Sequence, residues 1–264
     1  MGRRKGTKLT EYIIGNEYRY IQKSSSKGTQ EKFSNDGYWY KLNKMGYEAD
    51  AESLASLVLS CSNVKTSVVY EKCIINGRIG CRSKNFLLPQ EEFLTFQNLY
   101  AIYEGGSLSN KISSYQDINQ RISYTIQFIK DCTNFDCSEY LSKILTLDML
   151  ILNEDRHFHN LGVVRAGDKF HEAPVFDNGF SLLCDYSRYP AFLSESEWIE
   201  SIDTIAALPF SGSFELQANA IGLGLKLDYK KLYSALAAFE ETRAKKVLLY
   251  QLERYKNEFM IKKT

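Results

Sequence analysis

Residues 151–164, ILNEDRHFHNLGVV, place ionisable and amide side chains at high density between two apolar runs. A structural loop needs only one or two residues with turn chemistry. Carboxylates beside histidine and amide groups can transfer a proton or hold a divalent metal ion. The loop therefore predicts a functional site. Its polar members are Asn153, Glu154, Asp155, Arg156, His157, His159 and Asn160.

The spacing within this loop fits phosphoryl transfer. That reaction needs a carboxylate to orient the nucleophile, an amide and a second carboxylate to hold Mg²⁺, and a lysine on the phosphates of ATP. Asp155 and Asn160 stand five residues apart, which is the separation of Asp and Asn in the catalytic loop of protein kinases. Asp177, in the stretch FDNG, follows a predicted hairpin, where kinases carry the metal-binding Asp of D-F-G.

A lysine and an acidic helix lie upstream, in the order that the same chemistry requires. The stretch YWYKL places Lys41 on a predicted strand, and the helix that follows offers Glu52 or Glu48 as its partner. Such a carboxylate would fix the ammonium group for the α- and β-phosphates. The phase of the helix is defined only to within a residue or two, so both glutamates stay open, with Glu52 preferred.

The elements that must position these groups begin with a sheet. Residues 16–23 and 37–43 are rich in aromatic residues with the period of strands, and the polar residues 24–36 are predicted to connect them. Residues 66–88 have strand character again, with a two-residue hairpin turn at Asn76-Gly77. The first third of the chain is therefore predicted to be mostly antiparallel sheet.

Helical patterns interrupt this sheet and then replace it. From Asp50, apolar residues recur at i, i+3, i+4 and i+7, which predicts a helix with one buried stripe. After residues 90–110 two helices are expected, the second strongly apolar and capped by Ser138. A short hairpin at 166–168 leads into FDNG, and residues 229–262 are predicted to be helical.

Composition and charge exclude several classes of protein. The 264 residues, 44% of them hydrophobic, suffice for one folded unit of one or two lobes. The formal charge of +1 provides no field for binding nucleic acid or an anionic membrane. No apolar run reaches the roughly 18 residues of a membrane span. Six cysteines without a C-x-x-C pair, and no signal-peptide pattern, predict reduced thiols in a cytoplasmic protein, with secretion by a route lacking a cleaved signal left open.

Three stretches give the chain a resemblance to a known family. They are SSSKGTQEKF at 24–33, NEDRHFHN at 153–160 and PVFDNG at 174–179. They resemble the Ser-rich phosphate loop, the N-x-D-x-H-x-x-N loop and the metal motif of the HipA-like and CtkA-like branch of the protein-kinase-like superfamily. The middle stretch also resembles the D-R-H-x-x-N of phosphatidylinositol kinases. The match spans about residues 24–184.

The resemblance implies an α+β protein with a two-lobed, protein-kinase-like fold. A lobe of antiparallel sheet with one helix would span residues 1–95, and a helical lobe residues 96–264. ATP and Mg²⁺ would be the cofactors. The implied roles are Asp155 as catalytic base, His157 as the loop histidine beside it, Asn160 and Asp177 as Mg²⁺ ligands, Lys41 with Glu52 as the ATP-binding pair, and Ser26, Gly28, Thr29 and Gln30 as parts of the phosphate loop.

The sequence departs from the common kinase pattern in three places. The phosphate loop has one glycine instead of G-x-G-x-x-G, so its contacts with phosphate must rely on Ser, Thr and Lys groups. DNG at 177–179 replaces D-F-G, which argues against regulation by a flipping Phe. No A-P-E motif follows, so the peptide-binding part of the larger lobe should differ from that of ordinary eukaryotic-type kinases.

The resemblance also implies an acceptor and a partner. Ser or Thr of a protein would receive the phosphate, and an antitoxin-type partner is conceivable for proteins of the HipA kind. Members of that kind phosphorylate serines in their own phosphate loop, and Ser24, Ser25 and Ser26 occupy that place. Autophosphorylation is expected there. Its effect would be to shut off ATP binding, because a phosphate group carries nearly two negative charges and would repel the phosphates of ATP.

Three other functions stay open. A lipid or small-molecule kinase would use the same cleft, and a catalytically silent ATP-binding module would keep the same fold. A metal-dependent phosphodiesterase could use His157, His159 and His171, which lie within fifteen residues, together with Asp155 or Asp177. The separation of only two residues between the first two histidines, in a loop, counts against that site.

Overall fold

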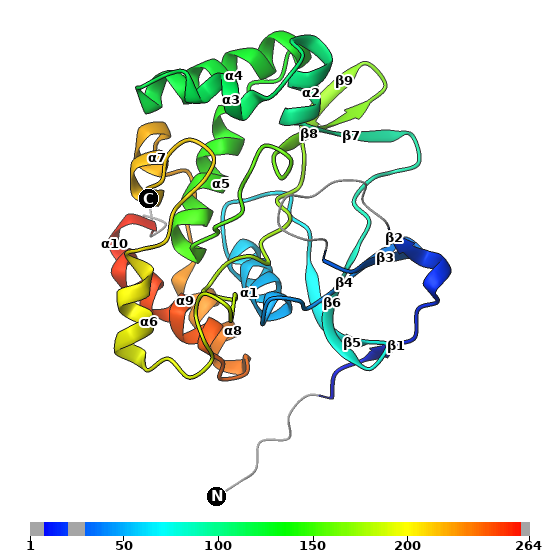
Figure 1. Ribbon diagram of the computed structural model, residues 1–264, viewed down its shortest axis with the longest axis vertical. Helices are drawn as coiled ribbons and strands as arrows, with labels where there is room; N and C mark the ends of the chain where they lie inside the picture. Colours follow the sequence, from blue (N-terminus) through cyan, green and yellow to red (C-terminus); the bar gives the residue numbers. More distant parts are fainter. Residues whose placement is uncertain (1–7, 21–29, 260–264) are drawn as a thin grey trace, which may run out of the picture.

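The computed structural model describes residues 8–20 and 30–259, and it confirms the predicted α+β class. Figure 1 shows the strands of the N-terminal third on one side of the molecule and most of the helices on the other. Several residues predicted to act in the phosphate loop lie outside the described residues: Ser24, Ser25, Ser26, Gly28 and Thr29.

A six-stranded sheet forms the N-terminal part, in the order β1-β5-β6-β4-β3-β2. Neighbouring strands are antiparallel except β1 and β5, which are parallel. Aromatic and β-branched residues favour these strands because they fit a pleated, half-buried surface. The strands are β1 Glu11–Tyr12, β2 Arg19–Tyr20, β3 Lys32–Asn35, β4 Tyr38–Leu42, β5 Tyr70–Ile75 and β6 Arg78–Lys84, with a 3-10 helix η1 Asn16–Tyr18 before β2.

Two tight turns set the register of this sheet. The predicted Asn76-Gly77 turn joins β5 to β6 with φ of 49° and 76°, as a two-residue hairpin loop requires. Asp36-Gly37 joins β3 to β4 in the same way, with φ of 50° and 74°. Residues 32–35 are therefore a strand. The prediction that 24–36 only connects two strands was wrong there, because it gave no weight to the Asp-Gly hairpin signal.

The helical part begins with a second sheet. Strands β7 Glu91–Thr95, β8 Gly162–Ala166 and β9 Lys169–Glu172 are antiparallel, and β8 and β9 enclose the predicted turn at 166–168. Strand β7 precedes the predicted lobe boundary at 95 and yet pairs with β8, so that boundary stays a prediction. The helices are α2 Phe96–Tyr103, α3 Leu108–Ser113, α4 Ile118–Thr133, α5 Ser138–Ile151, α6 Glu195–Ile202, α7 Phe214–Ile221, α8 Tyr229–Ala238, α9 Arg243–Arg254 and α10 Lys256–Phe259.

Helix α5 is the apolar helix that was expected before the polar loop, and it ends at Ile151, where that loop starts. The capping position belongs to Cys137, and Ser138 is already inside the helix, so the predicted Ser138 cap was wrong. The Ser138 N–H donates a hydrogen bond to Asp136 Oδ1 at 3.0 Å. A carboxylate thus satisfies one of the N–H groups that a helix start leaves unpaired.

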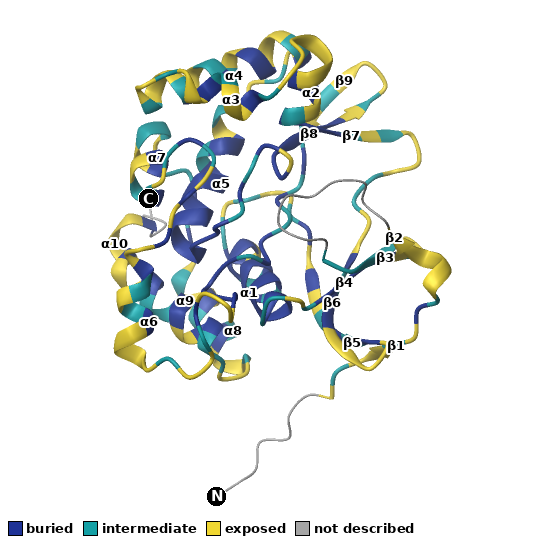
Figure 2. Ribbon diagram, in the orientation of Figure 1, coloured by how far each residue is buried: buried dark blue, intermediate teal, exposed yellow. Residues whose placement is uncertain are grey.

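Helix α1, Glu48–Ser60, packs against β5 and β6 of the sheet and also against the helical part. It begins two residues before the predicted start at Asp50. The predicted stripe that includes Leu54 and Val58 is fully buried and shares one hydrophobic core with α5, α8 and α9. Figure 2 shows much of α1 and α5 in the colour of buried residues. Helix α1 therefore bridges the sheet and the helical part.

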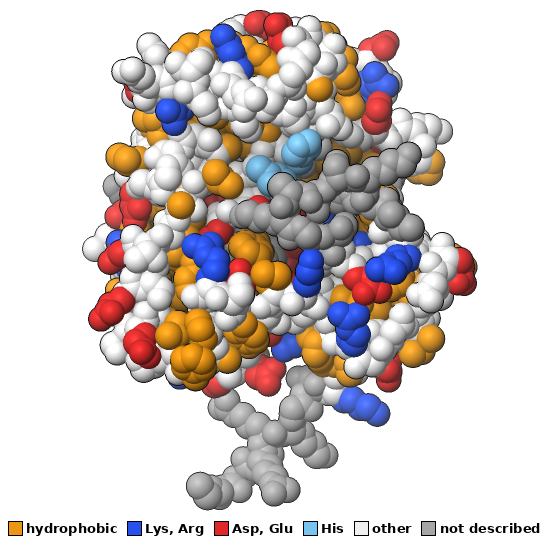
Figure 3. All heavy atoms as spheres, viewed as in Figure 1, with side chains coloured by type: hydrophobic (Ala, Val, Ile, Leu, Met, Phe, Trp, Pro, Cys, Tyr) orange, Lys and Arg blue, Asp and Glu red, His pale blue; other side chains and the backbone are white. Residues whose placement is uncertain are grey.

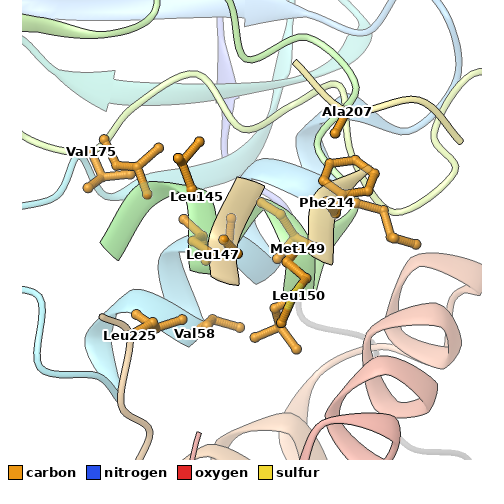
Figure 4. Close-up of a cluster of buried hydrophobic side chains, with 14 of the residues drawn as sticks. Val58, Leu145, Leu147, Met149, Leu150, Val175, Ala207, Phe214 and Leu225 are labelled. Atoms are coloured by element: carbon orange, nitrogen blue, oxygen red, sulfur yellow. The ribbon is translucent and has the colours of Figure 1, made fainter. Parts of the chain in front are cut away.

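Side chains of α1, α5 and α7 belong to this core. Figure 4 shows Val58 of α1, Leu147 and Leu150 of α5, and Phe214 of α7 in one cluster. Burial of apolar surface supplies most of the stabilisation of such a core. The sheet contributes smaller clusters of its own, such as the one around Phe33.

The cysteines belong to the packed interior. All six are free, and Cys132 alone among them is not buried. Burial raises the pKa of the Cys73 thiol to about 11 and that of Cys137 to about 12. Such thiols are poor nucleophiles. Over residues 8–20 and 30–259, no helix combines the length and the apolar character of a membrane span.

Leu147 tests the assignment of the core. Its side chain is fully buried, whereas Leu216 on α7 is 62% exposed. Leu147→Ala should lower the free energy of unfolding by about 2–5 kcal/mol, because it removes buried methyl groups and leaves a cavity. Leu216→Ala, the control, should change it by no more than about 0.5 kcal/mol. Urea unfolding followed by circular dichroism measures both, and equal losses would contradict the assigned core.

Candidate active site

Lys41 on β4 lies between two carboxylates that come from different elements. Its Nζ is 2.9 Å from Glu52 Oε1 on α1 and 2.7 Å from Asp177 Oδ1 in the loop after β9. It also donates to the Tyr70 hydroxyl at 3.3 Å. The Lys41 side chain is only 9% exposed. A buried ammonium group needs such partners, so one charge brings three separate segments to one point.

The structure resolves which glutamate pairs with Lys41. Glu52 makes the ion pair, and its other oxygen accepts the backbone N–H of Asn178 at 2.9 Å. Glu48 accepts backbone N–H groups of Lys44 at 2.9 Å and Met45 at 2.6 Å. Glu48 therefore closes the loop before α1 and does not reach the lysine.

The electrostatics of this cluster keep Asp177 ionised. Burial alone would raise the pKa of Asp177, but the Lys41 ammonium, with help from Lys32, holds it well below its usual range. Burial lowers the pKa of Lys41, and the two carboxylates more than reverse this, so the ammonium stays charged. Burial raises the pKa of Glu52 despite the nearby lysine. The Asp177 side chain is 29% exposed against 2% for Glu52, so Asp177 is the acid that a ligand can reach.

The polar loop after α5 holds Asp155 and Asn160 together. Leu152, with φ of 56°, turns the chain out of the helix. The Asp155 N–H donates to Asn153 Oδ1 at 3.1 Å, and the Asp155 carbonyl accepts from Asn160 Nδ2 at 2.9 Å. The same carbonyl accepts from the His157 N–H at 2.9 Å. These local bonds give the loop one shape, in which the predicted acid and amide are neighbours.

Arg156 ties this loop to the segment around Asp177. Its fully buried side chain binds the Asp148 carboxylate through Nε and Nη2, at 3.0 Å each. Its Nη1 donates to the Phe176 carbonyl at 2.9 Å and its Nη2 to Asn178 Oδ1 at 2.6 Å. Arg156 therefore binds the residues on both sides of Asp177 and brings the polar loop against it.

The loop histidines lie beside the predicted catalytic acid. His157 Nε2 is 3.8 Å from Asp155 Oδ2, and the rings of His157 and His159 are 5.6 Å apart. Histidine side chains are visible near the centre of the face in Figure 3. His171 belongs to β9. In the described part of the chain, no group of three or more His, Cys, Asp or Glu side chains is arranged to hold a metal ion.

Gln30 is the one predicted phosphate-loop residue that the structure describes. Its Nε2 donates to the Leu42 carbonyl at the end of β4, at 2.9 Å. Ser26, Gly28 and Thr29 lie outside the described residues. The described end of the loop thus lies against the strand that carries Lys41.

The structure joins the predicted residues through three that sequence patterns did not identify. Tyr70, Asp148 and Asn178 complete the cluster around Lys41 and Arg156. Tyr70 and Asn178 stand in stretches that have ordinary strand and turn patterns. Asp148 carries a usable signal, because an acid inside the apolar run LTLDML needs a buried partner.

Comparison with known proteins finds similarity in the fold but little similarity in the sequence. No protein-family model matches this sequence, and no curated protein sequence matches it either. The crystal structure of CtkA, a proinflammatory kinase of Helicobacter pylori, is similar with a TM-score of 0.60 over 87% of this chain and 90% of CtkA, at 16% identity. HipA of the Shewanella oneidensis MR-1 toxin–antitoxin system, in complex with HipB and operator DNA, gives 0.45 over 90% of this chain and 67% of HipA, at 12% identity.

The likeness to CtkA is a statement about fold. At such low identity a shared architecture does not carry the activity of one protein over to another. The HipA score is too low to add to the argument. The chain therefore has a two-lobed, CtkA-like kinase fold, and the prediction made from its three motifs is confirmed at that level.

Asp148 tests the buried ion pair. Asp148→Ala should lower the free energy of unfolding by about 3–5 kcal/mol, because it leaves the Arg156 guanidinium buried without its counter-charge. Asp168→Ala, in the exposed turn after β8, should change it by no more than about 0.5 kcal/mol. A double variant, Asp148→Leu with Arg156→Met, should recover part of the loss. A single variant no less stable than the control in urea unfolding would argue against the pair.

Proposed function

We propose that the protein is an ATP-dependent phosphotransferase that transfers the γ-phosphate of ATP to a Ser or Thr hydroxyl of a protein. The observation that carries the proposal is the contact of Lys41 with both Glu52 and Asp177, beside a loop that holds Asp155 and Asn160 together. The CtkA-like fold supports it, because kinases need these groups in this chain order.

Mg²⁺ fits the donors that the site offers. Mg²⁺ prefers oxygen ligands and is usually bound by one or two carboxylates together with substrate phosphates and water. Lys41 keeps the Asp177 carboxylate ionised. Asn160 uses its amide N–H toward the Asp155 carbonyl, which leaves Oδ1 as an acceptor. Asp177 and Asn160 would hold the ion, and when bound it supplies positive charge to the phosphates of ATP.

The residues of the chain divide the remaining work. Lys41 is anchored by Glu52, and in this proposal the N–H groups that reach Asp177 and Tyr70 in the structure would turn to phosphate oxygens. Asp155 orients the acceptor hydroxyl and takes its proton while the hydroxyl oxygen bonds to the γ-phosphorus, the bond to the β-phosphate oxygen breaks, and ADP leaves. His157 lies 3.8 Å from the Asp155 carboxylate, where it helps to keep that group oriented.

The phosphate loop is a second acceptor in the proposal. Ser24, Ser25 and Ser26 precede Gln30, whose bond to Leu42 fixes the described end of the loop next to the Lys41 strand. A phosphate group in this loop would repel the phosphates of ATP. Peptide mapping after incubation with ATP tests this. An antitoxin-type partner and a cytoplasmic location stay predictions.

Asp155 tests the reaction. With γ-labelled ATP, Mg²⁺ and a mixture of protein acceptors, Asp155→Asn should lower turnover about 100-fold or more, because it removes the base. Chelation of Mg²⁺ should abolish turnover, and Asp168→Asn in the exposed turn should leave it unchanged.

The destination of the label separates the alternatives. Label in Ser or Thr of protein supports the proposal, whereas label in lipid or in a small molecule identifies another kind of kinase. Thermal stabilisation by ATP without any turnover identifies a binding module.

Lys41 tests nucleotide binding. Lys41→Met should raise the KM for ATP about 10-fold or more, because it removes charge-assisted hydrogen bonds to phosphate. The control is Lys72→Met, which removes another ion pair between the sheet and α1, with Asp50 at 2.7 Å. An equal rise in KM in both variants would show that Lys41 acts only by holding α1.

A further inference from the structure

Asn178, directly after Asp177, has no exposed surface and touches both halves of the site. Its Oδ1 accepts from Arg156 Nη2 at 2.6 Å, and its backbone N–H donates to Glu52 Oε2 at 2.9 Å. Its carbonyl accepts from Ser181 Oγ at 2.7 Å. Asn178 thus links the polar loop after α5 to helix α1, whose Glu52 pairs with Lys41.

These contacts act on the backbone of Asp177. Arg156 binds the carbonyl of Phe176 and the side chain of Asn178, one residue on each side. Asp177 itself has φ of 58°, a left-handed conformation that a residue with a side chain adopts at a cost. Neighbours anchored on both sides offset that cost and leave Asp177 a single backbone conformation.

The side chain at position 178 must also supply a hydrogen-bond acceptor. Arg156 Nη2 carries two N–H groups, one bonded to Asp148 and one to Asn178, so a Leu or Phe at this place would leave the second N–H without an acceptor. An amide or a carboxylate oxygen at this place can supply that acceptor. Asn178 Nδ2 has no partner among the described residues.

We propose that Asn178 is a positioning residue: through Arg156 and Glu52 it holds the Asp177 carboxylate where it binds Mg²⁺. The metal part of this proposal rests on the proposed function. The positional part does not, because it concerns only contacts within the chain. The loop around Asp177 is then held in place by a buried polar network, and Asp177 leaves its position only if the bond to Arg156 breaks.

Three variants test the proposal. Asn178→Leu removes the acceptor at similar size, and Asn178→Asp restores it. Gln217→Leu is the control, since Gln217 is equally buried in α7 and bonds the backbone of Phe210 and Leu208 away from this network. Hydrogen–deuterium exchange of the peptide 176–182 reports backbone order without any need for activity. The Mg²⁺ concentration that gives half-maximal ATP turnover reports the metal site.

Asn178→Leu should exchange about 10-fold faster over 176–182 and need about 10-fold more Mg²⁺, as expected for the loss of a hydrogen bond to a charged group. Asn178→Asp should stay within about 3-fold of the parent protein in both measurements. Gln217→Leu should lower the melting temperature and leave both measurements unchanged.

The outcomes separate this proposal from the proposed function. Unchanged exchange and an unchanged Mg²⁺ requirement in Asn178→Leu would overturn the positioning role even if the parent protein is an active kinase. A faster exchange in that variant with no ATP turnover in the parent protein would support the positional role and reject the proposed function. Failure of Asn178→Asp to recover either measurement would show that Oδ1 is not the group that matters.

Discussion

A single buried ammonium group holds three parts of this fold together. Lys41 reaches from the sheet to Glu52 on α1 and to Asp177 in the loop after β9. A charge in the protein interior is costly unless its partners stay in place, so each of these segments depends on the other two. The cluster also contains two carboxylates for one ammonium group. Asp177 is the more exposed of the two carboxylates and stays ionised, so it is the one that a ligand cation can reach.

A second buried charge continues this arrangement into the helical part. Arg156 is paired with Asp148 on α5 and binds the backbone of Phe176 and the side chain of Asn178. Helix α1 packs into the same hydrophobic core as α5. Catalytic groups placed on rigid elements and supported by buried hydrogen bonds are held more narrowly than groups on loops. The site is thus assembled by the folding of the core, with the sheet bringing the lysine.

Local chemistry explains which predictions from sequence succeeded. The Asn76-Gly77 hairpin and the apolar helix before the polar loop depend on neighbouring residues alone, and both are present. The strand at 32–35 was mistaken for a connector because its residues are mostly polar and the Asp36-Gly37 hairpin signal was given no weight. The Ser138 cap was misplaced by one residue, since helix ends are decided by small differences among adjacent groups.

The sequence alone determined the chemical groups and their order: an acid and an amide five residues apart, a strand lysine before an acidic helix, and an acid after a hairpin. Tertiary structure decided which of them meet. Lys41 and Asp177 are 136 residues apart in the sequence. Which of Glu52 and Glu48 pairs with Lys41 depends on the rotation of α1 in its packed position, and the structure selects Glu52. The spacing of hydrophobic residues predicts that a segment is helical, but it does not predict which distant residues the helix contacts. Those contacts are selected by packing and by the pairing of buried charges.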